Sequence, residues 1–345
     1  MKYKTYCMSR RGATHIKLDM PCQDYSMSEE YNGSCIAMVS DGHGNKKHYL
    51  SDRGSKIACN VAMEEVKSFL DMIDQTDIND RAQMDNRLNE LKEKVCFRWK
   101  QEVKKDFYDN GFDDLSDEND LKEEQIEIAY GCTLCVAFTA EWGWAAIQIG
   151  DGSFTIAEEN GKFKWVMPES ILNEDNLTAS LCLYDPMEDF RHVYGNDKPI
   201  GFFVYTDGIE KVLPEQGKEI ISFLDWVIKN DKDNSERKEE TLRETLDIFS
   251  ARSHIGDDVS IAYIYDEEAM NIKPKYEEAD KNIKMKSLRA RVEELKSTID
   301  YNNKLLEELG NEEWFKKCKI RMLVKSKEEE LAQLEKSISE LSDGE

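Results

Sequence analysis

The chain has 345 residues and a formal net charge of −24 at pH 7. This length allows one large domain with an appendage, or two domains, and the negative charge excludes a nucleic-acid-binding surface because a polyanion would be repelled. We also expect no membrane partner, because no apolar run approaches the ~18 residues that span a bilayer and residues 1–6 lack an apolar signal core.

The cysteines point to a reducing compartment. There are nine, an odd and scattered set, which favours a cytoplasmic location over a disulfide framework. Cys132 and Cys135 form an isolated CxxC. On a strand this odd offset places them on opposite faces, so we interpret them as core residues and not as zinc ligands.

In chain order, runs rich in Val, Ile, Phe and Tyr predict strands, and apolar residues at helical spacing predict helices. The expected strands are 34–40, 131–139, 142–149, 152–157, 162–166, 179–184, 200–206 and 258–265. The expected helices are 51–73, 81–108, 218–229 and 236–250, with an acidic loop at 109–124. Asn32-Gly33 is a turn signal that predicts a hairpin across 25–40. Strand blocks interrupted by helix pairs predict an α+β fold, a four-layer α-β-β-α sandwich, over residues 1–267.

Beyond about residue 268 the pattern changes to two heptad seams. The first seam is Leu288, Val292, Leu295, Ile299, Asn302, Leu306 and Leu309. The second is Ile320, Val324, Lys327, Leu331, Leu334, Ile338 and Leu341. Gly310-Asn311 lies between them, and Gly commonly ends helices, so residues 268–345 are predicted to form an antiparallel, coiled-coil-like helical hairpin. Either the two helices cover each other's apolar seam, or the arm at 276–342 binds a partner or a second copy.

Four acids stand where a short apolar run meets a turn, each beside a glycine: Asp41, Asp151, Asp207 and Asp257. Such acids are held rigidly by their strands and can point into a cleft. Carboxylate oxygens are the ligands that Mg²⁺ and Mn²⁺ prefer. Acids from distant parts of the chain are therefore predicted to converge on a metal site.

The ordered set of motifs around these acids is more specific than any one of them. It runs Gly12…His15…Pro21-Cys22-Gln23-Asp24, Asp41-Gly42-His43-Gly44, Gly131-Cys132-Thr133-Leu134, Ile149-Gly150-Asp151-Gly152, Thr206-Asp207-Gly208 and Gly256-Asp257-Asp258-Val259-Ser260. Over residues 1–267 this series resembles the metal-dependent serine/threonine protein phosphatases of type 2C, in the form that bacterial relatives have.

The resemblance implies a site for two Mn²⁺ or Mg²⁺ ions at one end of the sandwich. Asp41 matches the acid that bridges both ions, Gly42 matches the residue whose carbonyl is a ligand, and Asp207 and Asp257 match ligands of one ion. A supporting acid corresponds to Asp24, and the ligand of a weaker third ion corresponds to Asp151. Two such ions lower the pKa of a shared water, which then attacks phosphorus, so no Ser or Cys nucleophile is needed.

His43 matches the histidine proposed as the general acid for the leaving alkoxide, a role that suits its ordinary pKa. The alternative is that His43 only hydrogen-bonds Asp41 or a water at the site. Asp258 could support Asp257 or act through water.

Two positions depart from the family pattern. Gln23 stands where many members have Glu, and Asp19 stands where an Arg usually binds the substrate phosphate. Arg10 and His15 are the candidate phosphate contacts, with Arg11 and Lys17 nearby. The segment 167–198 corresponds to a variable flap beside the site.

These observations predict an enzyme that hydrolyses phosphoserine and phosphothreonine in proteins, with a phosphoprotein substrate and a cognate Ser/Thr kinase as partners. The alternatives are a catalytically weak regulatory protein that binds a phosphoprotein through the same fold, and an assembly scaffold built on the helical arm.

Overall fold

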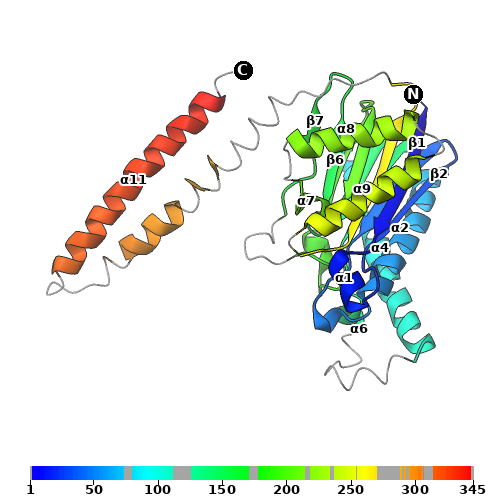
Figure 1. Cartoon of the computed structure of the whole chain (residues 1–345), viewed down its shortest axis with the longest axis horizontal. Coiled ribbons are helices and arrows are strands. Elements are labelled where there is room, and N and C mark those ends of the chain that lie inside the picture. The colour runs from blue at the N-terminus through cyan, green and yellow to red at the C-terminus, as the bar shows by residue number, and fades with distance from the viewer. Residues whose placement is uncertain are drawn as a thin grey trace. The chain divides into compact units, whose positions relative to one another are not determined.

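The computed structural model describes residues 2–73, 80–111, 126–170, 178–213, 218–233, 237–253, 255–269, 288–289, 291–292, 295–304, 306 and 314–342. Contacts divide the chain into two compact units (Figure 1). The first joins Met1–Pro214 to Glu219–Pro274, and the second joins Glu215–Lys218 to Lys275–Glu345.

Two antiparallel sheets of five strands each form the centre of the first unit. One sheet has the order β1 (Tyr3–Arg10), β10 (Val259–Asp266), β9 (Gly201–Tyr205), β6 (Ser153–Ala157) and β7 (Phe163–Trp165). The other has the order β2 (Tyr25–Tyr31), β3 (Ser34–Ser40), β4 (Leu134–Ala140), β5 (Gly143–Ile149) and β8 (Arg191–Gly195).

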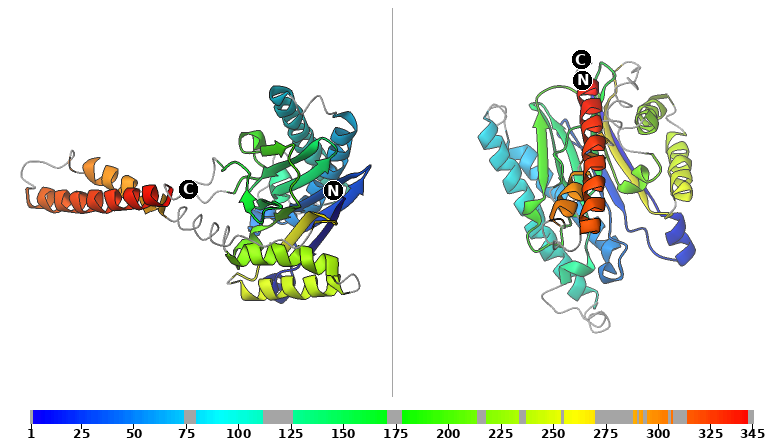
Figure 2. Two further views of the ribbon diagram at one scale, coloured as in Figure 1. Left: turned by 90° about the horizontal axis from the view of Figure 1, so that it is seen from above. Right: turned by 90° about the vertical axis from the view of Figure 1, so that its left-hand side faces the viewer.

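Helices cover the outer face of each sheet, as the right-hand view of Figure 2 shows. On the β2–β8 sheet lie α2 (Ser51–Met72) and α4 (Arg81–Asp109), and on the β1–β7 sheet lie α8 (Lys218–Asp233) and α9 (Lys238–Arg252). The short helices are α1 (Ala13–Leu18), η1 (Lys46–His48), α6 (Ile126–Ala129), η5 (Pro186–Glu188) and α7 (Asp207–Glu210). The predicted α+β, four-layer sandwich is therefore confirmed.

Strand β3 shows how the sequence builds these layers. Its seven residues are all buried, and successive side chains point to opposite faces. Ile36 and Met38 pack in the core beneath α2 and α4, whereas Ala37 and Val39 pack in the core between the sheets. The CxxC follows the same rule, since Cys132 lies in the first core and Cys135 in the second. The eight cysteines whose side chains the structure describes are free.

Most predicted elements are present within a few residues of their expected ends. The hairpin turn at Asn32-Gly33 is confirmed, with φ of 47° and 83°, the positive values that such a turn requires. The strand predicted at 179–184 is wrong. The structure describes those residues as a turn-containing segment, in which the backbone N–H of Leu181 donates to the carbonyl of Cys132. The predicted loop at 109–124 lies mostly outside the described residues.

The sequence patterns missed two strands, β1 and β8, both at sheet edges. Part of the segment 167–198, expected to be a variable flap, is therefore the strand β8, which pairs with β5. An edge strand has a neighbouring strand on one side only and is less buried, so its run of apolar residues is less continuous than that of a central strand.

The second unit contains the helix α11 (Trp314–Ser342) and helical residues at 295–304. Ile299, Ile320 and Val324 form its buried cluster, so residues of the two predicted seams pack together. Lys296 and Glu335 form an ion pair of 3.7 Å across the helices. The predicted turn at Gly310-Asn311 lies outside the described residues. Each described helix is too short or too polar to cross a membrane.

We predict that a chain ending at residue 269 folds by itself. It keeps β10 between β1 and β9, and it keeps the bond from the Glu267 backbone N–H to the Lys2 carbonyl, 2.9 Å. Thermal unfolding followed by circular dichroism should be cooperative, with a Tm close to that of the full chain. An insoluble or non-cooperative product would show that the residues beyond 269 belong to the core.

Candidate active site

Antiparallel pairing gathers the predicted site acids at one end of the sandwich. Tyr25 pairs with Ser40, so Asp24 lies just before β2 at the edge where Asp41 follows β3. In the other sheet Tyr205 pairs with Ile261, so Asp207 after β9 comes beside Asp257 before β10. The start of an antiparallel strand adjoins the end of its neighbour, which explains why residues far apart in sequence meet.

A buried hydrogen bond joins the two edges. The Thr206 hydroxyl donates to Asp24 Oδ2 at 2.8 Å, linking the end of β9 in one sheet to the start of β2 in the other. Asp24 is only 4% exposed. Both sheets therefore present their acids to a common region.

Asp41 is held through its backbone. Its N–H donates to the Thr133 hydroxyl at 3.0 Å, and its carbonyl accepts from the Thr133 N–H at 2.8 Å. Among the described residues no group donates a hydrogen bond to the Asp41 carboxylate. The segment that precedes β4 thus fixes the loop and leaves the carboxylate available for a ligand.

Gly42 is needed because the backbone is crowded there. A Cβ at this position would lie 2.6 Å from the Gln23 carbonyl oxygen and 2.8 Å from that of Ser51. No side chain fits between those two backbone segments. This close approach brings the loop after β3 against both the segment before β2 and the start of α2.

Lys211 is the counter-charge that the sequence patterns missed. It follows α7 by one residue, and its Nζ lies 2.9 Å from Asp207 Oδ2 and 2.5 Å from Asp257 Oδ2. Two predicted ligand acids are thus bridged by one ammonium group. The spacing of Asp207 and Lys211, four residues apart at the start of a helix, is the signal that could have revealed the pair.

Asp258 ties the segment between β1 and β2 to the start of β10. Its Oδ1 accepts hydrogen bonds from the Gly12 N–H and from His15 Nδ1, the latter at 2.9 Å, and its Oδ2 accepts from the Gln23 N–H and, at 3.3 Å, from the Asp24 N–H. These bonds lower the pKa of Asp258 although burial opposes them. Asp258 therefore positions Asp24.

The remaining acids repel one another. Burial raises the pKa of Asp41, and the charges of Asp24, Asp207, Asp257 and Asp151 raise it further. Burial and the charge of Asp151 likewise raise the pKa of Asp207, against the opposing effect of Lys211. These mutual effects place the acids in one electrostatic environment, in which a nearby positive charge would relieve their repulsion.

The His43 ring packs beside His48, with ring centroids 4.8 Å apart, and its backbone N–H donates to the Gly131 carbonyl. Burial, followed by the charges of His48 and Lys47, lowers the pKa of His43 to about 4. The ring is therefore neutral near pH 7, and no hydrogen bond joins it to Asp41 among the described residues.

The two candidate phosphate contacts already have partners. Arg10 Nε and Nη2 donate to the two carboxylate oxygens of Asp247 at 2.7 and 3.0 Å, and His15 is bound to Asp258. Either residue would have to leave its partner to bind a phosphate. Asp151 accepts a hydrogen bond from the Thr178 hydroxyl at 2.9 Å.

The acid cluster fits a divalent cation in its donor chemistry. Asp207 Oδ1 is a buried oxygen with no hydrogen-bond partner, and so is Gln23 Oε1. Buried oxygens without partners are costly unless something binds them. In the part of the chain that the structure describes, however, no three His, Cys, Asp or Glu side chains are grouped closely enough to hold an ion. The ligand set of Asp24, Asp41, Gly42, Asp151, Asp207 and Asp257 therefore stays a prediction.

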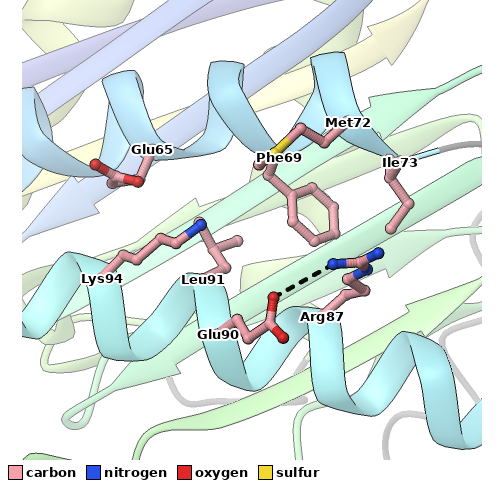
Figure 3. Close-up of a pocket in the computed structure, with 8 residues that line it drawn as sticks. All are labelled: Glu65, Phe69, Met72, Ile73, Arg87, Glu90, Leu91 and Lys94. Carbon is pink, nitrogen blue, oxygen red and sulfur yellow. Dashed lines mark hydrogen bonds and ion pairs between the residues drawn. The ribbon is translucent and has the colours of Figure 1, made fainter.

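A separate pocket lies between α2 and α4 (Figure 3). Apolar side chains such as Phe69 and Leu91 line it together with charged ones such as Glu65 and Arg87. Its volume is about 60 Å³, far below the several hundred Å³ of typical ligand sites. None of the predicted site acids lines it, so the acid cluster remains the candidate active site.

A family model described as protein phosphatase 2C matches residues 11–247. This match covers more than half of the chain, so the chain belongs to the protein phosphatase 2C family. The resemblance drawn from the ordered motifs is thereby confirmed.

Solved structures with the same fold include a bacterial serine phosphatase, which is 12% identical with a TM-score of 0.50 and covers 79% of this chain and 98% of that chain. Stp1 of Staphylococcus aureus, a serine/threonine phosphatase, is 12% identical with a TM-score of 0.48, covering 77% and 96%. The catalytic domain of the phosphatase PstP, crystallised with two manganese ions, is 12% identical with a TM-score of 0.47, covering 76% and 97%. At such identities the likeness concerns the fold alone. No curated protein matches the chain.

We predict that His15→Gln destabilises the fold more at about pH 5.5 than at about pH 8.5. The bond to Asp258 raises the pKa of His15, so this contribution is complete below the unfolded pKa of about 6.5 and is lost as the pH rises through the folded value. The lowered pKa of Asp258 adds stability that is lost only as the pH falls below about 4.

Urea unfolding at the two pH values measures this difference. His192→Gln is the matched control with the opposite sign, because burial lowers the pKa of His192 and its contribution is lost as the pH falls. Equal costs of His15→Gln at both pH values would contradict the charged pair.

Proposed function

We propose that this chain hydrolyses phosphoserine and phosphothreonine in proteins, using two Mn²⁺ or Mg²⁺ ions and a third, weaker ion at Asp151. The observation that supports this most directly is the antiparallel pairing that brings Asp24 beside Asp41 and Asp207 beside Asp257 at one end of the sandwich. The buried, unpartnered oxygen of Asp207 supports a cation there.

In this proposal Asp41, the Gly42 carbonyl, Asp207 and Asp257 hold the ions. When bound, divalent ions supply Lewis acidity and counter-charge that make water a nucleophile toward a phosphomonoester. Thr206 and Asp258 keep Asp24 in place beside the ligands, through the bonds described above.

His43 lies two residues after Asp41 in the chain and has two candidate roles. In the first it protonates the leaving alkoxide, and in the second it orients a water or a ligand acid. Its lowered pKa favours the neutral ring, which is the weaker proton donor, so the two roles need an experimental test.

A second candidate is a catalytically weak protein that binds a phosphoprotein through the same fold. The specific observation in its favour is Lys211, whose ammonium is bound to Asp207 and Asp257. Gln23 in place of an acid points the same way. Mn²⁺-dependent hydrolysis of p-nitrophenyl phosphate separates the two candidates, because only the enzyme turns over.

For partners we propose a phosphoprotein substrate, made by a Ser/Thr kinase. The segment 276–342, predicted to be a helical hairpin, would bind a partner or a second copy, or its two helices would only cover each other's apolar seam. The test compares the hydrolysis rates of the full chain and of a chain ending at residue 269, on a phosphoprotein and on a small ester. If the segment recruits the substrate protein, the truncation slows hydrolysis of the phosphoprotein and leaves hydrolysis of the small ester unchanged.

We predict that Asp207→Asn abolishes metal-dependent hydrolysis and leaves the fold intact. Losing one charge relieves repulsion among the acids that raise the pKa of Asp207. Asp225→Asn is the matched control, because Asp225 also pairs with a lysine four residues on, Lys229, at 2.6 Å, and has a buried Oδ1 without a partner. Hydrolysis rates and thermal unfolding measure both effects. Retained turnover in Asp207→Asn would remove Asp207 from the site.

We predict that His43→Ala, if His43 is the general acid, slows substrates with poor leaving groups by roughly 10²–10⁴-fold. Activated aryl phosphates should be affected far less, because their leaving groups need no proton. The comparison of kcat for an alkyl and an aryl phosphate measures this. An equal loss on both would assign His43 the orienting role.

A further inference from the structure

Lys211 makes a different kind of contact from the lysine of a comparable helix ion pair in the described part of the chain, Asp225–Lys229. Lys229 bonds one carboxylate, Asp225, on its own helix. Lys211 instead bridges two carboxylates from separate elements, Asp207 at the start of α7 and Asp257 in the segment before β10. Its side chain is 30% exposed, so it reaches the site from the solvent side and can move away without disturbing the core.

The two oxygens that Lys211 binds belong to acids that the proposed function assigns to a divalent ion. An oxygen that accepts a hydrogen bond from an ammonium group at 2.5–2.9 Å directs its lone pair and its charge to that group. A divalent ion coordinated by the same acids would also repel the ammonium strongly at short range. Lysine and ion are therefore placed to compete for these two acids.

The flexibility of lysine makes such an exchange feasible. Its ammonium stands on a four-carbon stem with rotatable bonds, and the backbone of Lys211 stays anchored by the bond from its N–H to the Asp207 carbonyl, 2.8 Å. The side chain can thus swing out while α7 keeps Asp207 in place.

We propose that Lys211 is a tethered cation that competes with the divalent ion for Asp207 and Asp257, and so sets the affinity of the site for metal. This inference rests on the proposed function. Lys211 offsets the repulsion between the two acids when no ion is bound, and it raises the concentration of metal needed to load the site.

The test is isothermal titration of Mn²⁺ into chelator-treated full-length protein, together with thermal unfolding in chelator. Lys211→Met should bind Mn²⁺ at least about tenfold more tightly than the wild type, ~1.4 kcal/mol. It should also have a lower Tm in chelator and a larger rise in Tm on adding Mn²⁺. Lys211→Gln should behave in the same way, and Lys211→Arg, which keeps the charge, should bind as the wild type does.

Lys229→Met is the matched control and should leave Mn²⁺ affinity unchanged. If the wild type binds Mn²⁺ and neither Lys211→Met nor Lys211→Gln binds it more tightly, Lys211 is not a competitor, while the proposed function stands. If no form of the protein binds Mn²⁺, the proposed metal-dependent function fails, and this inference fails with it.

Discussion

The concentration of negative charge at one end of the sandwich is the constraint on which the rest of this site depends. Asp24, Asp41, Asp207 and Asp257 adjoin strand ends that antiparallel pairing brings together. Burial and mutual repulsion raise the pKa of Asp41, so the arrangement costs free energy unless other groups offset it. The fold tolerates this cost because a β-strand next to each acid, before or after it in the chain, holds its backbone in place.

The negative charge of each acid is compensated by different groups, and these differences indicate different roles. Asp258 receives hydrogen bonds from His15 and three backbone N–H groups, which suits a structural acid. Asp24 has the Thr206 hydroxyl. Asp207 and Asp257 share the ammonium of Lys211. The Asp41 carboxylate accepts no hydrogen bond among the described residues, so it is the acid most open to a ligand.

The strands that the sequence patterns predicted are mainly those buried on both faces. β3, β4 and β10 are rich in apolar residues, are buried over nearly their whole length and lie inside their sheets. β1 and β8 were missed because edge strands are half-exposed and mix polar with apolar residues. The segment 179–184 contains buried apolar residues such as Leu181, which is the pattern of a strand. In the structure it is an irregular segment whose apolar side chains pack against the core.

By itself the sequence determined the layers, the acids and the family, because buried strands and glycine-flanked acids leave local patterns that need no knowledge of distant contacts. Only the tertiary structure decided which groups meet. In the folded chain Arg10 pairs with Asp247 and His15 with Asp258. Lys211 lies between Asp207 and Asp257. Ion pairs between strand ends depend on sheet register and on the packing of two sheets, and no local pattern encodes either.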